Sequence, residues 1–276
     1  MTQNLWLIPL GFLIGTYGTL IGAGGGFILM PILVLLYPKE NPELLTSISL
    51  AVVFFNAFSG SVAYARMRRI DYRSGFLFSV ATVPGAIFGA LTTAYIPRWL
   101  FDVIFGVLMI VASAFLLLHP NRKKELKEEI PNYHLTRTLI DANGTNHTYF
   151  YNPIVGVGLS LFVGYISSLL GIGGGIIHVP TLVHLLNFPI HIATATSHFI
   201  LAFMAMTGTT VHVATGVFSH GLRRTIPLAI GVLLGAQLGA RFSIHLHGNW
   251  IIRGSAIALG FVGIRILLMA VLTSHR

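Results

Sequence analysis

The chain has 276 residues, of which 54% are hydrophobic and only 9% are charged. A soluble domain carries nearer ~25% charged residues, so the composition excludes a water-soluble protein and indicates an integral membrane protein. The formal charge is +9, but the basic residues lie mainly in loops between apolar stretches, which is typical of cytoplasmic loops and excludes a nucleic-acid partner. Cysteine is absent, which excludes disulfides, a thiol nucleophile and a cysteine-ligated metal.

Eight apolar stretches predict an all-α polytopic membrane protein with about eight transmembrane segments. Strict alternation of apolar and polar residues, which is typical of β-barrel strands, is absent. The stretches run at about 5–37, 44–65, 74–96, 99–118, 153–187, 191–217, 225–244 and 250–272.

The first stretch, 5–37, and the fifth, 153–187, are too long for one straight crossing, which needs ~20 residues. Each contains a glycine-rich pentad, Gly22–Gly26 in the first and Gly171–Gly175 in the second. Glycine weakens a helix by ~1 kcal/mol per residue relative to alanine, so we expect each helix to break at its pentad. A broken helix can cross the membrane as two half-helices or return as a re-entrant hairpin.

The similarity between the two halves extends beyond the pentads and indicates a duplicated unit. Matching pairs include Gly22 with Gly171, Ser49 with Ser197 and Arg73 with Arg223, at spacings of 149, 148 and 150 residues. We therefore predict two four-segment repeats, at 1–118 and 153–276, joined by a polar cytoplasmic linker at 119–152.

The basic loops bear on how the repeats are oriented. Arginines cluster at 66–73, at 223–224 and, with lysines, at 122–127. If both pentad stretches cross the membrane, all three loops are cytoplasmic, the repeats are parallel and both termini are cytoplasmic. If they are hairpins, the repeats are inverted and Arg223 faces outside. The charge pattern favours the first arrangement in a cell inner membrane.

The second half-helix of each pair begins with free N–H groups and a partial positive charge, which suit an anion. Close helix packing is the alternative role for these glycines. Polar residues on one face of the second and sixth stretches, with a histidine after the second pentad, complete the predicted site. The predicted substrate-binding residues are Gly24, Gly25, Gly26, Ser49, Asn56, Gly173, Gly174, Gly175, His178, Ser197 and Thr209.

Two further histidines and one arginine are candidates for coupling and anion contact. His198 and His212 lie on one stripe of the sixth stretch and could carry a proton. Arg241 is a possible anion contact, with interfacial anchoring as its alternative role. The sequence has no histidine-rich metal-binding motif and few intramembrane acids, so we predict no metal and no cofactor.

The two motifs together resemble the sulfite exporter TauE/SafE family, also called the four-TMS toluene sulfonate uptake permease family. They are Gly22-x-Gly-Gly-Gly-Phe-x-x-x-Pro31 with Asn56-x-x-Ser59-Gly60, and Gly171-x-Gly-Gly-Gly-x-x-x-x-Pro180 with Ala195-Thr196-Ser197. The resemblance covers both halves and implies a secondary transporter of sulfur-containing anions driven by protons. The histidine-rich second half and the long linker depart from the family pattern.

The sequence therefore predicts a proton-coupled secondary transporter, an exporter of sulfite or organosulfonates, with alternating access around the two broken helices. The expected partners are the anion, protons and membrane lipid, and a homo-oligomer is a further option that the sequence leaves open. A passive anion channel with the same site is the first alternative. A histidine-metal membrane enzyme is the second, and we predict that the protein is not an enzyme.

Overall fold

The computed structural model describes residues 4–118, 135–243, 256 and 259–270. The first half contains the helices α1 (Leu7–Ile21), α2 (Gly26–Leu36), α3 (Pro42–Arg66), α4 (Tyr72–Thr93) and α5 (Arg98–Leu118). The second contains α6 (Pro153–Leu170), α7 (Gly175–His184), α8 (Ile190–Ala214), α9 (Phe218–Phe242) and a further helix at Leu259–Ala270. The basic run at 122–127 and the predicted start of the last stretch, 250–255, lie outside the described residues.

Both pentads interrupt a helix, as predicted. The first separates α1 from α2, and the second separates α6 from α7. Three glycines in each pentad have positive φ angles, between +67° and +85°, which side chains of L-residues rarely adopt. These are Gly22, Gly24 and Gly25 in the first pentad and Gly171, Gly173 and Gly174 in the second.

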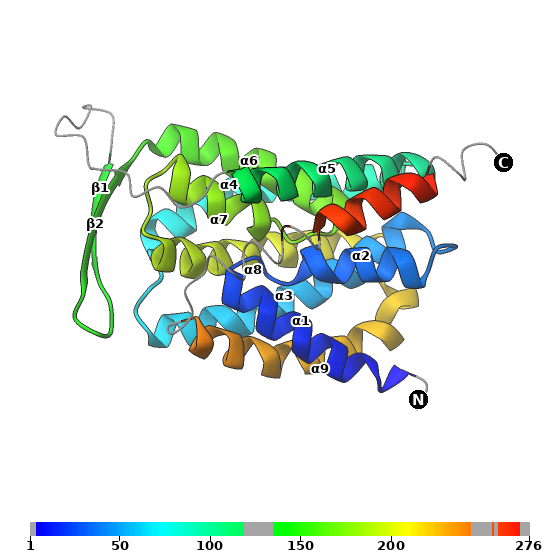
Figure 1. Cartoon of the computed structure of the whole chain (residues 1–276), viewed down its shortest axis with the longest axis horizontal. Helices are drawn as coiled ribbons and strands as arrows, with labels where there is room; N and C mark the ends of the chain where they lie inside the picture. The colour runs from blue at the N-terminus through cyan, green and yellow to red at the C-terminus, as the bar shows by residue number, and fades with distance from the viewer. Residues whose placement is uncertain (1–3, 119–134, 244–255, 257–258, 271–276) are drawn as a thin grey trace.

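The packing of α1 and α3 against α9 shows in which direction α2 runs. Gly11 of α1 faces Leu228 of α9, and four residues further along both helices Gly15 faces Val232, so α1 and α9 are parallel. Helix α3 is also parallel to α9, because its Ile48 packs on Gly221 and its Ser59 bonds to Leu233. Helix α2 must therefore return to the end of the molecule where α1 began, as Figure 1 shows.

The second pentad produces the same reversal at the opposite end. Helix α6 begins directly after the strand that ends at Tyr151, and the loop after α7 places Phe188 against that same tyrosine, with ring centroids 5.2 Å apart. Helix α7 thus returns to the end where α6 began (Figure 1). The structure has the hairpin arrangement at both pentads, whereas the sequence analysis favoured crossings. Hydropathy does not separate the two, because a returning helix is as apolar as a crossing one.

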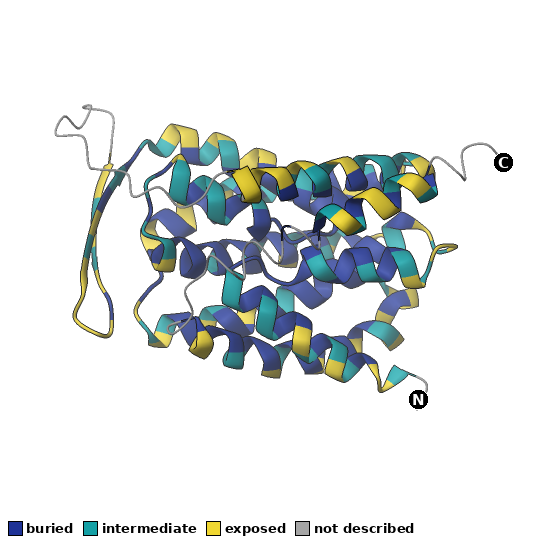
Figure 2. Cartoon of the chain, in the orientation of Figure 1, coloured by how far each residue is buried: buried dark blue, intermediate teal, exposed yellow. Residues whose placement is uncertain are grey.

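Six helices in the described residues are long and apolar enough to cross a membrane. They are α3, α4, α5 from Arg98 to Phe115, α6, α8 and α9. The protein is thus a polytopic helical membrane protein, and the eight predicted crossings are not confirmed. Figure 2 shows α2 and α3 mostly buried inside the bundle, while α5 and α9 carry exposed residues on their outer faces.

Glycines bring helices of the two halves into close contact. Helix α1 packs against α9, and α6 packs in the same way against α4. At Gly164 of α6, for example, a Cβ atom would lie 2.5 Å from the carbonyl oxygen of Thr82 on α4. Small residues are the usual basis of close helix packing in membranes, so each half is held mainly by the other.

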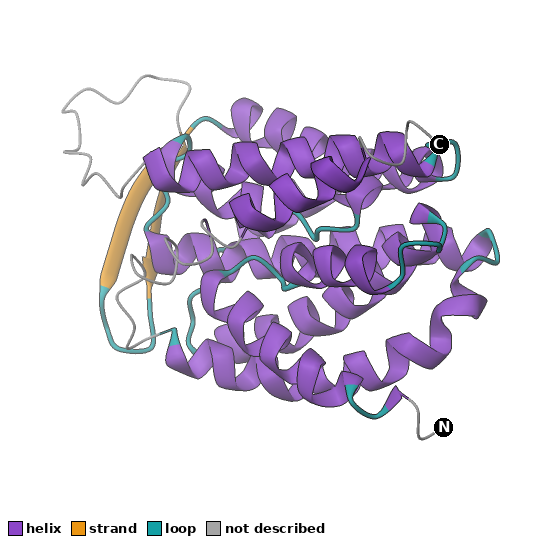
Figure 3. Ribbon diagram, turned by 45° about the vertical axis from the view of Figure 1, so that its right-hand side comes forward, coloured by secondary structure: helices purple, strands orange, loops and turns teal. Residues whose placement is uncertain are grey.

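A β-hairpin lies within the predicted linker and corrects the all-α prediction. Strands β1 (Leu135–Ile140) and β2 (Asn146–Tyr151) pair antiparallel, with Thr138 opposite Thr148. The hairpin stands at one end of the helix bundle (Figure 3). It contacts the loop between α3 and α4, because the Ala142 N–H donates to the Met67 carbonyl at 3.1 Å.

Candidate functional site

The two helix breaks pack directly against each other in the middle of the protein. A Cβ atom on Gly26 would lie 2.6 Å from the Ile172 carbonyl oxygen. In the reciprocal contact, a Cβ atom on Gly175 would lie 2.6 Å from the Gly22 carbonyl oxygen. The glycines predicted as substrate contacts therefore also allow the two backbones to meet. Close packing, the alternative role that the sequence left open, thus applies to the same residues as the predicted anion binding.

Two predicted serines hold the breaks from opposite halves. The Ser49 hydroxyl on α3 donates to the Gly171 carbonyl oxygen at 2.5 Å. The Ser197 hydroxyl on α8 donates to the Gly22 carbonyl oxygen at 3.3 Å. Each serine thus fixes the break of the other repeat, and its single proton is used by the backbone in this structure.

A buried polar cluster lies beside the first break. The Thr19 hydroxyl donates to Asn56 Oδ1 at 3.2 Å, and His198 Nε2 lies 3.3 Å from the same hydroxyl. Gly60 makes room for the imidazole, because a Cβ atom there would lie 2.5 Å from His198 Cδ2. The Tyr64 hydroxyl donates to the Thr19 carbonyl oxygen at 2.8 Å and completes the cluster.

His178, in the first turn of α7, is the predicted polar residue beside the second break, and the predicted Thr209 lies on α8. His178 is buried, with 2% of its surface exposed, and its Nε2 lies 3.2 Å from the Ser160 hydroxyl. Its Nδ1 and the half-buried Thr209 hydroxyl have no hydrogen-bond partner among the residues that the structure describes. Gly174, in the break itself, packs on Ser167, with 2.6 Å between the position of a Cβ atom and Oγ.

The structure does not bring His212 or Arg241 to the breaks. His212 is 14 residues beyond His198 on α8, a separation of ~21 Å along a helix. Its Nδ1 lies 3.9 Å from Glu43 Oε1 at the start of α3. Arg241 is exposed in the last turn of α9.

Sequence reasoning missed Thr19, Tyr64 and Ser160 as parts of the buried clusters. Thr19 precedes Gly22 by three residues, so it faces the break from one helical turn away, and that spacing was the available signal. Nothing in the spacing of Tyr64 or Ser160 indicated their partners, because both bond to residues on other helices or half-helices.

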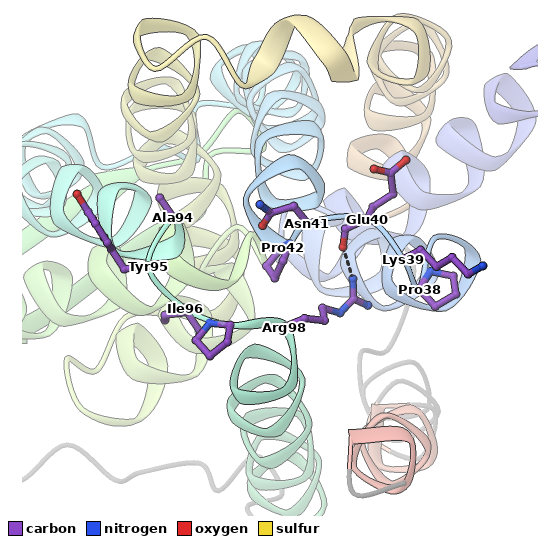
Figure 4. A pocket seen from close by; sticks show the side chains of 10 residues that line it. Pro38, Lys39, Glu40, Asn41, Pro42, Ala94, Tyr95, Ile96 and Arg98 are labelled. Carbon is purple, nitrogen blue, oxygen red and sulfur yellow. Dashed lines mark hydrogen bonds between the residues drawn. The ribbon is translucent and has the colours of Figure 1, made fainter. Parts of the chain in front are cut away.

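A separate surface pocket of about 440 Å³ lies between the α2–α3 and α4–α5 loops. It is lined by residues 38–42 and 94–98, shown in Figure 4. Arg98 closes one side of it and donates to the Glu40 carbonyl oxygen at 2.8 Å and to both carboxylate oxygens of Asp102 at 2.9 Å. Its guanidinium is therefore already neutralised within the protein.

Comparison with known proteins gives one family and several relatives. The family model for "Sulfite exporter TauE/SafE" matches residues 7–266. A relative from Bacillus subtilis named "Probable membrane transporter protein YunE" is 32% identical over 95% of this chain and 96% of its own length. A second B. subtilis protein, "Probable membrane transporter protein YdhB", is 26% identical over 86% of this chain and 89% of its own.

A more distant relative of the same description, from Methanocaldococcus jannaschii, is 22% identical over 95% of this chain and 94% of its own length. No solved structure matches the chain. The family match spans both helix breaks and all six long apolar helices. This chain is a multi-pass membrane protein of the sulfite exporter TauE/SafE family.

Proposed function

We propose that the protein is a secondary transporter that exports small sulfur-containing anions, such as sulfite or organosulfonates, in exchange for or together with protons. Its family and the names of its relatives indicate a membrane transporter of the TauE/SafE type. The observation that carries the proposal is the meeting of two helix breaks inside the bundle, which brings the N-termini of α2 and α7 together. Such N-termini favour anions.

The proposed topology is a pair of inverted repeats, each beginning with a re-entrant hairpin. Helices α3, α4, α5, α8, α9 and the last segment would cross, and α1–α2 and α6–α7 would enter and return from opposite sides. Arg66, Arg68 and Arg73 lie at the end that carries the hairpin, where Arg69 faces Asp141 at 3.9 Å. The positive-inside rule makes that end cytoplasmic and puts both termini on the other side of the membrane. The proposed orientation revises the one favoured from the sequence, in which both termini are cytoplasmic.

Inverted repeats with binding at their interface are a recurring basis of alternating access. In this proposal, the hairpin α1–α2 opens toward one side of the inner membrane and α6–α7 toward the other. Rocking one half against the other exposes the breaks alternately. The contacts at Gly26 and Gly175 are then the pivot, because there the backbone of each break lies directly on the backbone of the other.

The test is sulfite flux in proteoliposomes that contain the full-length protein, with and without an imposed pH gradient. A coupled transporter accumulates sulfite against its gradient when protons flow. Flux that only runs downhill identifies a passive anion channel, and absence of flux for sulfite and organosulfonates contradicts the proposal. Gly174→Val, at a positive φ, should abolish flux, whereas the control Gly158→Val, which faces open space, should keep it.

A further inference from the structure

The two breaks have the same backbone conformation but differ in the side chains around them. At the first break, Thr19, Asn56 and His198 form a polar set, and all three are fully buried. The residues at the corresponding positions of the second break are Ser168, Met204 and Leu50, also buried. The duplicated fold therefore contains one polar and one largely apolar copy of the same environment.

Hydrogen bonding within the polar set fixes the orientation of the Asn56 amide. The Thr19 hydroxyl gives its only proton to Asn56 Oδ1 at 3.2 Å, so its oxygen accepts from His198 Nε2 at 3.3 Å. The carbonyl end of the amide is thus occupied. Its NH₂ end has no hydrogen-bond partner among the described residues, although Asn56 is fully buried.

The unpartnered NH₂ group points at the start of α2. Asn56 Nδ2 lies 3.6 Å from the position that a Cβ atom would have on Gly25, the N-cap residue of α2. No side chain caps this 11-residue helix. The N–H groups of Ile28 and Leu29 donate to the Gly25 carbonyl oxygen at 3.1 and 3.0 Å, so the N–H groups without an acceptor in the helix are those of Gly26 and Phe27. Two kinds of donor therefore converge on one place, and a buried donor without an acceptor is costly unless a ligand supplies one.

We propose that Asn56 Nδ2 and the first N–H groups of α2 form the principal anion subsite, which accepts a deprotonated oxygen of a compact oxoanion such as sulfite or a sulfonate. The inference rests on the proposed function and restricts it to the first break. The subsite presents donors and no carboxylate, so a neutral analogue that carries N–H donors fits it poorly. Thr19 and His198 act as positioning residues, because they hold the amide with its NH₂ group toward the anion.

Calorimetric binding of sulfite and methanesulfonate to the detergent-purified full-length protein tests this subsite. Asn56→Ala should weaken binding at least tenfold, and Asn56→Asp more, since it replaces the donor with a negative charge. Thr19→Val, which keeps the volume but frees the amide, should weaken binding severalfold. The matched control Met204→Ala, at the corresponding position of the second repeat, should change affinity less than threefold. Methanesulfonamide should not bind.

The outcomes separate this inference from the function it refines. The subsite is overturned, while anion transport stays in place, by either of two results. One is wild-type affinity in both Asn56→Asp and Thr19→Val. The other is a larger loss of affinity in Met204→Ala than in Asn56→Ala. Equal binding of methanesulfonamide and methanesulfonate overturns its donor-only chemistry. If the wild-type protein binds neither anion, the proposed function itself fails. Thermal melting of each variant identifies any that does not fold. If the Asn56 variants do not fold, the affinity of the nearly isosteric Thr19→Val decides whether the subsite exists.

Discussion

The Ser49 hydroxyl lies 2.5 Å from the Gly171 carbonyl oxygen and joins α3 of the first repeat to the break of the second. Ser197 makes the reciprocal bond to Gly22 at 3.3 Å. All four residues are buried, so no water replaces a lost partner. The two halves are therefore joined through the backbone of their most irregular segments.

Removing the Ser49 hydroxyl should destabilise the protein measurably. Ser49→Ala leaves the Gly171 carbonyl oxygen buried without that donor, at a cost of about 1–3 kcal/mol. Ser197→Ala should cost less, because its bond is longer. Thermal unfolding in detergent gives the ranking, with exposed Ser219→Ala as the control. Equal melting temperatures in all three variants would show that neither bond contributes.

Adding a methyl group where the breaks meet should separate them. Gly26→Ala and Gly175→Ala both place a Cβ atom within 2.6 Å of the opposite backbone, and overpacking of this kind costs about 1–3 kcal/mol or more. We expect lower melting temperatures and reduced anion flux. Gly158→Ala, which meets open space inside α6, should melt no lower than the wild type and keep its flux. Unchanged flux in both break variants would argue against a pivot at this contact.

His178 should contribute to anion binding less than Asn56 does. Its Nε2 is engaged with the Ser160 hydroxyl at 3.2 Å, which leaves only Nδ1 for a ligand. We expect His178→Ala to weaken sulfite binding about two- to threefold, or ~0.4–0.7 kcal/mol. Titration calorimetry beside Asn56→Ala provides the comparison. A tenfold loss in His178→Ala would mean that the second break binds the anion as strongly as the first.

The hairpin should loosen when its link to α4 is cut. The Tyr149 hydroxyl donates to Asp71 Oδ2 at 2.7 Å, and burial together with the Asp71 carboxylate raises the pKa of Tyr149, so the tyrosine stays a donor. Tyr149→Phe should lower the hydrogen-exchange protection of strand β2, at a cost of about 1–3 kcal/mol. The control is Thr148→Ala, which removes only the exposed contact between the Thr148 and Thr138 hydroxyls at 3.3 Å. Equal protection in both variants would show that the aromatic packing alone holds the hairpin.

The turn of the hairpin should respond to acid. Hydrogen bonds from the Thr145 and Asn143 N–H groups, with His147 and Arg69 nearby, lower the pKa of Asp141 below its usual 3.8. Because the folded pKa is the lower one, the carboxylate stabilises the turn above pH ~4, and this stabilisation is lost as the pH falls through the folded value. Hydrogen exchange corrected for intrinsic rates should show the turn opening below that range. Asp141→Asn should open it already at neutral pH.

Sequence reasoning succeeded where a local pattern determines the backbone and failed where distant contacts do. The glycine pentads predicted both breaks, because positive φ angles need glycine. The direction of α2 was missed, since Arg223 and Arg224 suggested a cytoplasmic loop, whereas Arg224 is paired with Glu40 at 2.7 Å and lies over the Tyr37 ring. A paired arginine is a weak topology signal.

The hairpin was predictable but was overlooked. Asn143-Gly144 is a strong turn signal, and the tyrosines at 149 and 151 alternate with a more exposed residue, as in a half-buried strand. Because a charged run at 122–127 precedes the hairpin, the whole linker was predicted only as a polar segment. In contrast, no local pattern identifies Thr19 as the partner of both Asn56 and His198, because the three residues lie on different helices and His198 comes from the other repeat.

An experimental density map of the protein with selenite, a heavier analogue of sulfite, tests the central claim most directly. We predict selenium density beside Asn56 Nδ2 and the first turn of α2, with both helices interrupted at their pentads. Selenium bound instead in the surface pocket at residues 38–42 and 94–98, or an uninterrupted helix through 21–26, would contradict the account.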